Sequence, residues 1–276
     1  MKANHATSLK PPSKWFQNGF HRFLEPYLRR HFHAMAVHRD THLDQQLPAI
    51  PSVDLSDAGL PVLVYCNHPS WWDPLLAHLL NRLVFAPRQF YAPIDAEALE
   101  KYPVFERLGF FGVQMKSNAG AAAFLKTTST IFQRDHAALW LTPEGRFCDA
   151  RDHDAALMPG LAHLCHRLTR GLVVPIAIEY VFWEERLPEC LIRFGECVSI
   201  EDHSDWGKSH WSDTLSERLR SSQNALAALA IARQAEPFDN LLRGQQGASG
   251  LYDFFRRMNA FARGKKFNPA HGQQFQ

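Results

Sequence analysis

The chain has 276 residues, of which 46% are hydrophobic, and this is enough to form one large domain with a buried core. Its formal net charge of +2 and its lack of a long Lys/Arg run argue against a nucleic-acid-binding protein. The 15 histidines are scattered and form no HExxH or paired ligand spacing, so we expect neither a metal site nor a cofactor.

Cysteines and apolar segments indicate the compartment. The five Cys residues form no CxxC pair and lie mostly inside apolar runs, as buried thiols do in a reducing compartment. The first 15 residues contain no stretch typical of a signal peptide, and no segment reaches the roughly 18 apolar residues that span a bilayer. We therefore expect a cytoplasmic protein that is peripheral at the inner membrane face.

An amphipathic helix is predicted after the polar first 12 residues. Apolar residues recur from Trp15 to Phe32 at helical spacing, and Pro26 is expected to interrupt or kink the helix. Basic residues on the other face are typical of a helix lying in a membrane interface. A helix packed on the domain with its bases in solvent has the same pattern. Residues 1–50 are therefore assigned as a tail and an amphipathic helix that could contact a membrane.

Strands and helices alternate from residue 61 to residue 200, the larger part of an α/β core assigned to residues 51–205. Apolar runs predict strands over residues 62–65, 89–94, 111–115, 137–141, 172–182 and 190–200. Helical spacing or capping residues predict helices near residues 75–80, 96–101, 103–109, 120–131 and 160–171. This alternation predicts a mostly parallel central sheet covered by helices on both faces.

The pattern beyond Trp211 predicts helices. Residues 225–231 have a small-residue face, and residues 252–267 mix aromatic and basic side chains that could face a membrane or cap the sheet. Residues 206–276 are therefore assigned as a C-terminal helical extension packed on the core.

The first candidate site follows the strand predicted over residues 62–65. The sequence Asn67-His68-Pro69-Ser70-Trp71-Trp72-Asp73 places a histidine and a carboxylate in a strand-to-helix turn, where α/β folds present reactive groups. A neutral imidazole held by a carboxylate can take a proton from a hydroxyl group. Structural roles also stay open: Asp73, before Pro74, would suit an N-cap, and His68 could bond the turn backbone.

Two further segments supply candidate binding groups. In Thr142-Pro143-Glu144-Gly145-Arg146, Gly145 permits close approach of the backbone, and Arg146 can bind a phosphate or carboxylate bidentately. The Glu144 carboxylate could accept a hydrogen bond from the hydroxyl of an acceptor substrate, or it could hold Arg146 in place. Lys116, followed by Ser117 and Asn118, lies at a predicted helix start, which predicts either an anion site or a solvated first turn.

Together these segments resemble the sequence blocks of the glycerolipid acyltransferase family, which includes bacterial lysophosphatidate acyltransferases. Residues 67–73 resemble its NHxSxxD block, and residues 142–146 resemble its PEG block at the expected distance downstream. Residues 174–178 resemble its fourth block, and residues 109–116 occupy the place of its second. The resemblance covers roughly residues 60–200, with the four blocks in order.

The resemblance implies an acyltransferase of phospholipid biosynthesis, with His68 as general base and Asp73 orienting it. An acceptor hydroxyl would attack the thioester of an acyl-CoA or an acyl-carrier protein, giving an ester and a free thiol without an acyl-enzyme. The implied partners are this donor, a lysolipid acceptor and a membrane surface. The implied substrate-binding residues are Asn67, Ser70, Lys116, Glu144, Gly145, Arg146 and Pro175, with the last shaping a pocket.

Two departures from the family pattern fall on the phosphate-binding side. The second block usually ends in an arginine, whereas this chain has Gln114-Met115 there and Lys116 one residue later. The third block usually reads EGTR, whereas Arg146 directly follows Gly145. The acceptor could therefore be another hydroxylated or aminated lipid, while the His/Asp pair is intact.

Two other functions compete with acyl transfer. A hydrolase could use Ser70 or Cys66 as nucleophile beside His68, although the chain has no GxSxG elbow. A non-catalytic lipid-binding protein could keep the same fold, but binding alone would not need a His/Asp pair. Trp71 and Trp72, between His68 and Asp73, could line an acyl channel, touch lipid or pack in the core.

Overall fold

The computed structural model describes residues 11–39, 59–114, 117–247 and 275. Within them, nine strands form one sheet in the order β4-β3-β5-β2-β6-β7-β1-β9, with β8 also paired to β6. The strands are β1 Ala34–His38, β2 Val62–Cys66, β3 Gln89–Asp95, β4 Phe110–Val113, β5 Ala137–Leu141, β6 Leu172–Val181, β7 Glu189–Phe194, β8 Val198–Ser199 and β9 Phe238–Arg243.

The half of the sheet from β4 to β6 is parallel, and the other half is mixed. Strand β7 is antiparallel to β6, β1 is parallel to β7, and β9 is antiparallel to β1. The prediction of an α/β fold with a mostly parallel central sheet is thus confirmed. The strand predicted over residues 190–200 is divided into β7 and β8, because the chain breaks its pairing with β6 between them.

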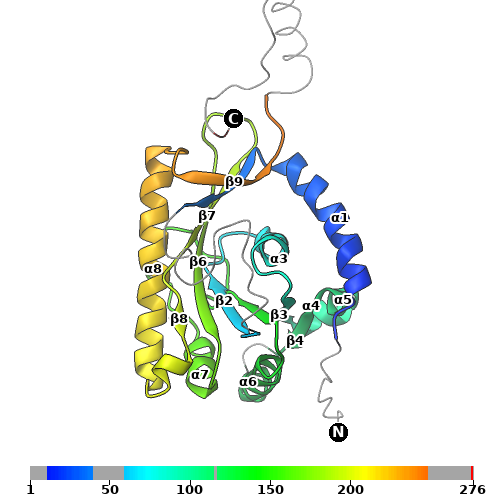
Figure 1. Ribbon diagram of the computed structural model, residues 1–276, viewed down its shortest axis with the longest axis vertical. Helices are drawn as coiled ribbons and strands as arrows, with labels where there is room; N and C mark the ends of the chain where they lie inside the picture. The colour runs from blue at the N-terminus through cyan, green and yellow to red at the C-terminus, as the bar shows by residue number, and fades with distance from the viewer. Residues whose placement is uncertain (1–10, 40–58, 115–116, 248–274, 276) are drawn as a thin grey trace, which may run out of the picture.

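Helices cover both faces of the sheet (Figure 1). Residues of β2 alternate strictly, with Val62, Val64 and Cys66 in one core cluster and Leu63 and Tyr65 in the other. The first cluster includes side chains of the helices α1 and α3, and the second includes side chains of α6, α7 and α8.

The helices are α1 Lys14–His31, α3 Asp73–Leu83, α4 Ala96–Lys101, α5 Val104–Leu108, α6 Asn118–Phe132, α7 Gly160–Arg167 and α8 Lys208–Ala232, with a 3-10 turn η1 Glu201–His203.

Helix α1 buries part of its apolar stripe against the domain and exposes the rest. The helix runs through Pro26 without interruption. Leu24 and Leu28 are fully buried against the domain, as expected for a packed helix. Trp15 and Phe23 belong to the same apolar stripe but are strongly exposed, and they share the outer surface with the bases. No helix among the described residues is long and apolar enough to cross a membrane.

Two strands at the far end of the sheet were not predicted. Strand β1 follows α1 directly, and β9 lies in the segment expected to be helical, so that expectation is right for α8 and wrong for Phe238–Arg243. The pairing of β1 with both β7 and β9 brings segments from both ends of the chain into one sheet. Residues 40–58 and residues 252–267 lie outside the described residues.

Candidate active site

The turn after β2 directs its polar side chains inward instead of capping α3. Trp72, not Asp73, is the N-cap residue, and Pro74 occupies the first turn of the helix. The buried carboxylate of Asp73 instead accepts from the backbone N–H of Ser70, at 3.1 Å, and contacts the imidazole of His68. The alternative in which Asp73 serves only as an N-cap is therefore wrong.

His68 and Asp73 form a close hydrogen-bonded pair. Nδ1 of His68 lies 2.6 Å from Oδ2 of Asp73. The Asp73 side chain is 2% exposed, whereas that of His68 is 18% exposed. Within the described residues no hydrogen bond engages Nε2 of His68, and the Phe147 ring lies beside the imidazole with centroids 4.4 Å apart. This geometry leaves Nε2 available to a proton donor from outside.

Tyr180 supports the pair from strand β6. Its hydroxyl donates to Oδ1 of Asp73 at 2.8 Å, so both carboxylate oxygens are engaged. Burial raises the pKa of Tyr180 well above its ordinary value, which keeps the hydroxyl protonated as a donor. Sequence analysis missed this residue. The available signal was a polar Glu-Tyr dipeptide near the carboxyl end of an otherwise apolar strand. Asn67 and Thr142 lie at the same edge of the sheet, because they follow the carboxyl ends of neighbouring parallel strands.

Asn67 fastens the turn to the neighbouring strand. Its side chain is buried and donates to the Ile178 carbonyl at 2.9 Å, while its Oδ1 accepts from the Ile178 N–H at 2.8 Å. The amide thus continues the pairing of β2 with β6 beyond the end of β2. Asn67 was predicted to bind substrate, but the structure directs its side chain into the sheet.

Residues 142–150 form the second loop of the site. The fully buried carboxylate of Glu144 accepts from the His68 N–H at 2.9 Å through Oε2 and from Arg220 at 2.9 Å through Oε1. Gly145 has φ +65°, and an added Cβ would lie 2.4 Å from Met158 Sδ, so the predicted close approach is to the protein itself. Glu144, predicted to bind substrate, therefore has both carboxylate oxygens engaged inside the protein, by the His68 backbone and by helix α8.

The remaining predicted binding residues are dispersed. Arg146 is exposed on the same loop, and Ser70 lines a cleft described below. Pro175 is buried inside β6 opposite Tyr65 and does not line that cleft. Lys116 lies outside the described residues, but Ser117 caps α6 by accepting from Gly120 N at 2.9 Å, as in a structural first turn.

A cleft of about 690 Å³ lies beside the active-site turn, and its lining includes Ser70 and Tyr180 but neither His68 nor Asp73. Ser70 and Trp72 of the turn and Tyr180 of β6 form one side of it, while Phe182 and Ile231 add exposed apolar surface. Arg151 and Glu179 form an ion pair on its wall, and burial raises the pKa of Glu179 while Arg151 opposes that effect. The cleft thus combines apolar walls with a few polar groups, as ligand sites do.

Comparison with known proteins assigns the family. The model of the acyltransferase family, described as "Acyltransferase", matches residues 36–179, more than half of the chain. A search of the curated proteins found no match. The matched segment contains both His68 and Asp73 and ends one residue before Tyr180. The chain therefore belongs to the acyltransferase family and is an acyltransferase.

Proposed function

We propose that the enzyme moves a fatty acyl group from an acyl-CoA or acyl-carrier-protein thioester to the hydroxyl of a lysophospholipid-like acceptor, with His68 as general base. The observation that carries this proposal is the 2.6 Å contact between His68 Nδ1 and Asp73 Oδ2, with Nε2 left unbonded by the described residues. A buried carboxylate on Nδ1 fixes the imidazole tautomer whose Nε2 accepts a proton.

The reaction follows from this arrangement. Nε2 of His68 takes the proton of the acceptor hydroxyl while the oxygen attacks the thioester carbonyl carbon. The carbon–sulfur bond then breaks, the imidazolium returns its proton to the leaving thiolate, and the products are an ester and a free thiol. Asp73 stabilises the imidazolium, and Tyr180 and the Ser70 N–H hold that carboxylate in place.

The cleft beside the active-site turn supports binding of a substrate with an apolar chain. Its lining includes Trp72, Phe182 and Ile231, and the Arg151–Glu179 ion pair offers both a donor and an acceptor to a polar head group. Arg146 provides a further exposed cation on the loop whose Phe147 ring lies beside His68. We assign this surface to the acceptor or to the acyl chain of the donor.

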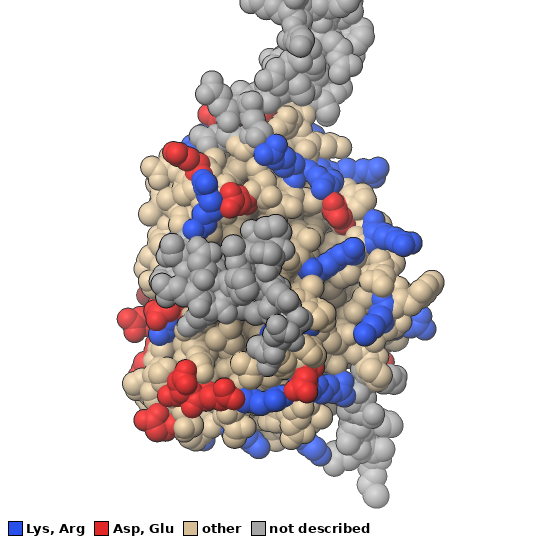
Figure 2. Space-filling view, viewed as in Figure 1, with Lys and Arg blue, Asp and Glu red and all other residues tan. Residues whose placement is uncertain are grey.

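The outer face of α1 supports action at a membrane surface. Trp15 and Phe23 are 82% and 60% exposed, and Arg22 and Arg30 lie on the same exposed side of the helix. Figure 2 shows Lys and Arg side chains spread along the side of the molecule that α1 forms. Aromatic side chains among bases suit the headgroup region of an anionic membrane, where a lysolipid acceptor would be found.

A hydrolase mechanism has less support. Cys66 is buried, its pKa is raised well above the ordinary value chiefly by burial, and its Sγ donates to the Leu141 carbonyl. The Ser70 hydroxyl accepts from Trp72 N at 3.4 Å, and it forms no hydrogen bond with His68 among the described residues. Neither side chain is therefore placed as a nucleophile activated by His68.

The test is acceptor-dependent thiol release. Purified protein is incubated with acyl-CoA and a panel of lysolipids in anionic vesicles, and free thiol is measured for wild type, His68→Ala and His166→Ala. His166 is a matched control because it bonds Trp206 O and does not line the cleft. We expect His68→Ala to lose about 100-fold or more of the turnover, as removal of a general base does, and His166→Ala to retain it.

Two results would overturn the proposal. Equal thiol release by His68→Ala and wild type would exclude His68 as the base. Silence of the wild type with acyl-CoA and again with acyl-carrier protein would exclude both proposed donors.

A further inference from the structure

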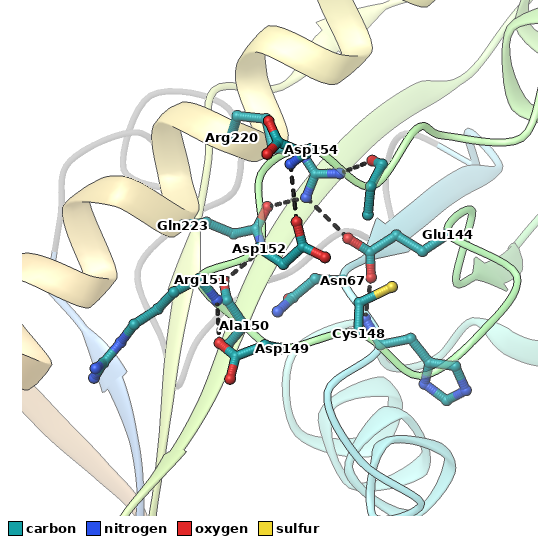
Figure 3. Close-up of polar contacts among 12 residues, drawn as sticks. Asn67, Glu144, Cys148, Asp149, Ala150, Arg151, Asp152, Asp154, Arg220 and Gln223 are labelled. Carbon is teal, nitrogen blue, oxygen red and sulfur yellow. Dashed lines mark hydrogen bonds and ion pairs between the residues drawn. The ribbon is translucent and has the colours of Figure 1, made fainter.

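A buried ionic network joins helix α8 to the active-site turn (Figure 3). Arg220, in the middle of α8, points toward Glu144, and its side chain is 11% exposed. Its guanidinium donates to Glu144 Oε1, to Gln223 Oε1 at 2.6 Å and to the Ala155 carbonyl. Two segments far apart in the sequence, α8 and residues 144–155, therefore meet at one guanidinium.

The network ends on the backbone of His68. Oε2 of Glu144 accepts from the His68 N–H at 2.9 Å, and the N–H of Cys148 donates to the His68 carbonyl at 3.0 Å. Both backbone polar groups of His68 are therefore held by the loop that contains Glu144. Gln223 adds a second link from α8 to this loop by donating to the Ala150 carbonyl at 2.8 Å.

The position of Glu144 depends on Arg220. A carboxylate with no exposed surface is costly unless a cation and hydrogen bonds compensate its charge. Arg220 is the cation that ion-pairs with Glu144 in the described residues, and it fixes one oxygen so that the other faces the His68 N–H. Without Arg220, Glu144 would turn toward water and release the turn.

We propose that Arg220 is a positioning residue for acyl transfer, which acts through Glu144 to fix the His68 backbone and hence the direction of its imidazole. This inference rests on the proposed role of His68 as general base. Arg220 reaches His68 through Glu144, so its loss should change the geometry of the base and not the substrate affinity. A displacement of about 1 Å at a catalytic group can lower a rate by about 100-fold.

The first measurement needs no substrate. Protein labelled with ¹⁵N-histidine is studied by NMR, and the His68 amide is identified as the signal lost in His68→Gln. We expect Arg220→Gln and Glu144→Gln to change the chemical shift of this amide. Arg218→Gln is the matched control, because Arg218 is also on α8 and ion-pairs with Glu196 at 2.7 Å, outside the site. An unchanged His68 amide in Arg220→Gln overturns the proposal.

The second measurement is a double-mutant cycle on turnover. We expect Arg220→Gln to lower kcat by about 10- to 100-fold with an unchanged KM for the acyl donor, and the double variant with Glu144→Gln to fall no further than the more damaging single change. The proposal would be overturned if the kcat losses of the two single variants multiplied in the double variant, or if Arg220→Gln kept the wild-type kcat. An effect of Arg220→Gln on KM alone would also overturn it.

Two provisions keep the test decisive. If Arg220→Gln does not fold, Arg220→Lys is used, because Lys retains the positive charge but lacks the bidentate guanidinium. It should show an intermediate kcat and an intermediate chemical shift of the His68 amide. If the wild type transfers no acyl group, the proposed function fails while the amide signal still reports whether Arg220 holds His68.

Discussion

The active-site turn is held from two sides by different kinds of contact. On the side of β6 and α8, which we call the polar flank, Asn67, Asp73 and the His68 backbone are fixed by directional hydrogen bonds to Ile178, Tyr180 and Glu144. On the side of α1, the aromatic flank, Trp72 packs edge-on against Phe32 at 4.9 Å between ring centroids and lies near Tyr27 and His31.

The two flanks contribute differently to the turn: one fixes its geometry, and the other holds it against the domain. Hydrogen bonds depend steeply on distance and angle, so the polar flank can fix the direction of the imidazole. Aromatic packing contributes mainly by buried area and tolerates small shifts, so the aromatic flank holds the turn against the domain and shapes the cleft. Changes on the polar flank should therefore affect turnover most, and changes on the aromatic flank should affect stability and substrate preference.

The largest effect is expected for Asn67→Leu. This change leaves the Ile178 N–H and carbonyl without their side-chain partners, which costs about 2–4 kcal/mol of the free energy of unfolding. It also frees the turn that carries His68, so turnover should fall about 100-fold in protein that is still folded. Urea denaturation and thiol release measure the two effects.

Asn81 provides the control for that prediction. It is also a buried amide, which donates to Arg88 O at 2.9 Å and accepts from Trp140 Nε1 at 3.0 Å, away from the turn. Asn81→Leu should lose comparable stability and keep near wild-type turnover. Equal losses of turnover in both variants would show that Asn67 acts only through global stability.

A smaller effect on turnover is expected for Trp72→Ala. Loss of the ring removes contacts with Phe32 and should lower the free energy of unfolding by about 2–3 kcal/mol, a little less than a fully buried Trp. Because Trp72 also lines the cleft, acyl-chain preference should move toward longer chains. Chain-length profiles and melting temperatures test this. Trp71→Ala, at a side chain that is 56% exposed and outside the cleft, should leave the chain-length profile unchanged.

The smallest effect is expected for His78→Phe, at a residue of α3 that lies outside the aromatic flank. This change should leave turnover at neutral pH unchanged. Burial, with a smaller contribution from His21, lowers the pKa of His78 to about 3. The unfolded chain, with a pKa near 6.5, therefore binds more protons than the folded chain between these values, so stability falls as the pH drops from about 6.5 toward 3. His21, whose pKa is lowered to about 4 mainly by burial, acts in the same direction.

Replacing His78 by Phe removes its share of that acid sensitivity. The ring already stacks on Phe90 with centroids 3.9 Å apart, so an aromatic replacement fits the site. Between pH 7 and pH 4 the wild type should lose on the order of 3 kcal/mol more stability than the variant in urea denaturation. Parallel stability curves for the two proteins would contradict the prediction.

Local patterns predicted most of the parallel half of the sheet and the family. Strand β5, helix α4 and the turn carrying His68 each depend on neighbouring residues, which is the information a single sequence contains. The resemblance to glycerolipid acyltransferases is supported by the family match. Roles assigned to individual binding residues stay predictions.

Long-range contacts account for what was missed. Nothing near Arg220 indicates that it meets Glu144, since the two are 76 positions apart and come together only when α8 packs on the sheet. Strand β9 has the mixed sequence FDNLLR, whose apolar pattern fits a strand edge as well as a helix. Glu144 was predicted to face a substrate because the sequence does not reveal its internal partners.

The place of β1 in the sheet has a consequence for synthesis of the protein. Strand β1 pairs with β7 and β9, which are made roughly 150 residues later or more. At about 5–20 residues per second, the ribosome needs roughly 8–30 s to supply the first of these partners. During this interval α1 and β1 have no completed sheet to join. Final closure of the sheet is therefore a late event, and the exposed apolar side of α1 would be open to chaperones or to a membrane before the fold is complete.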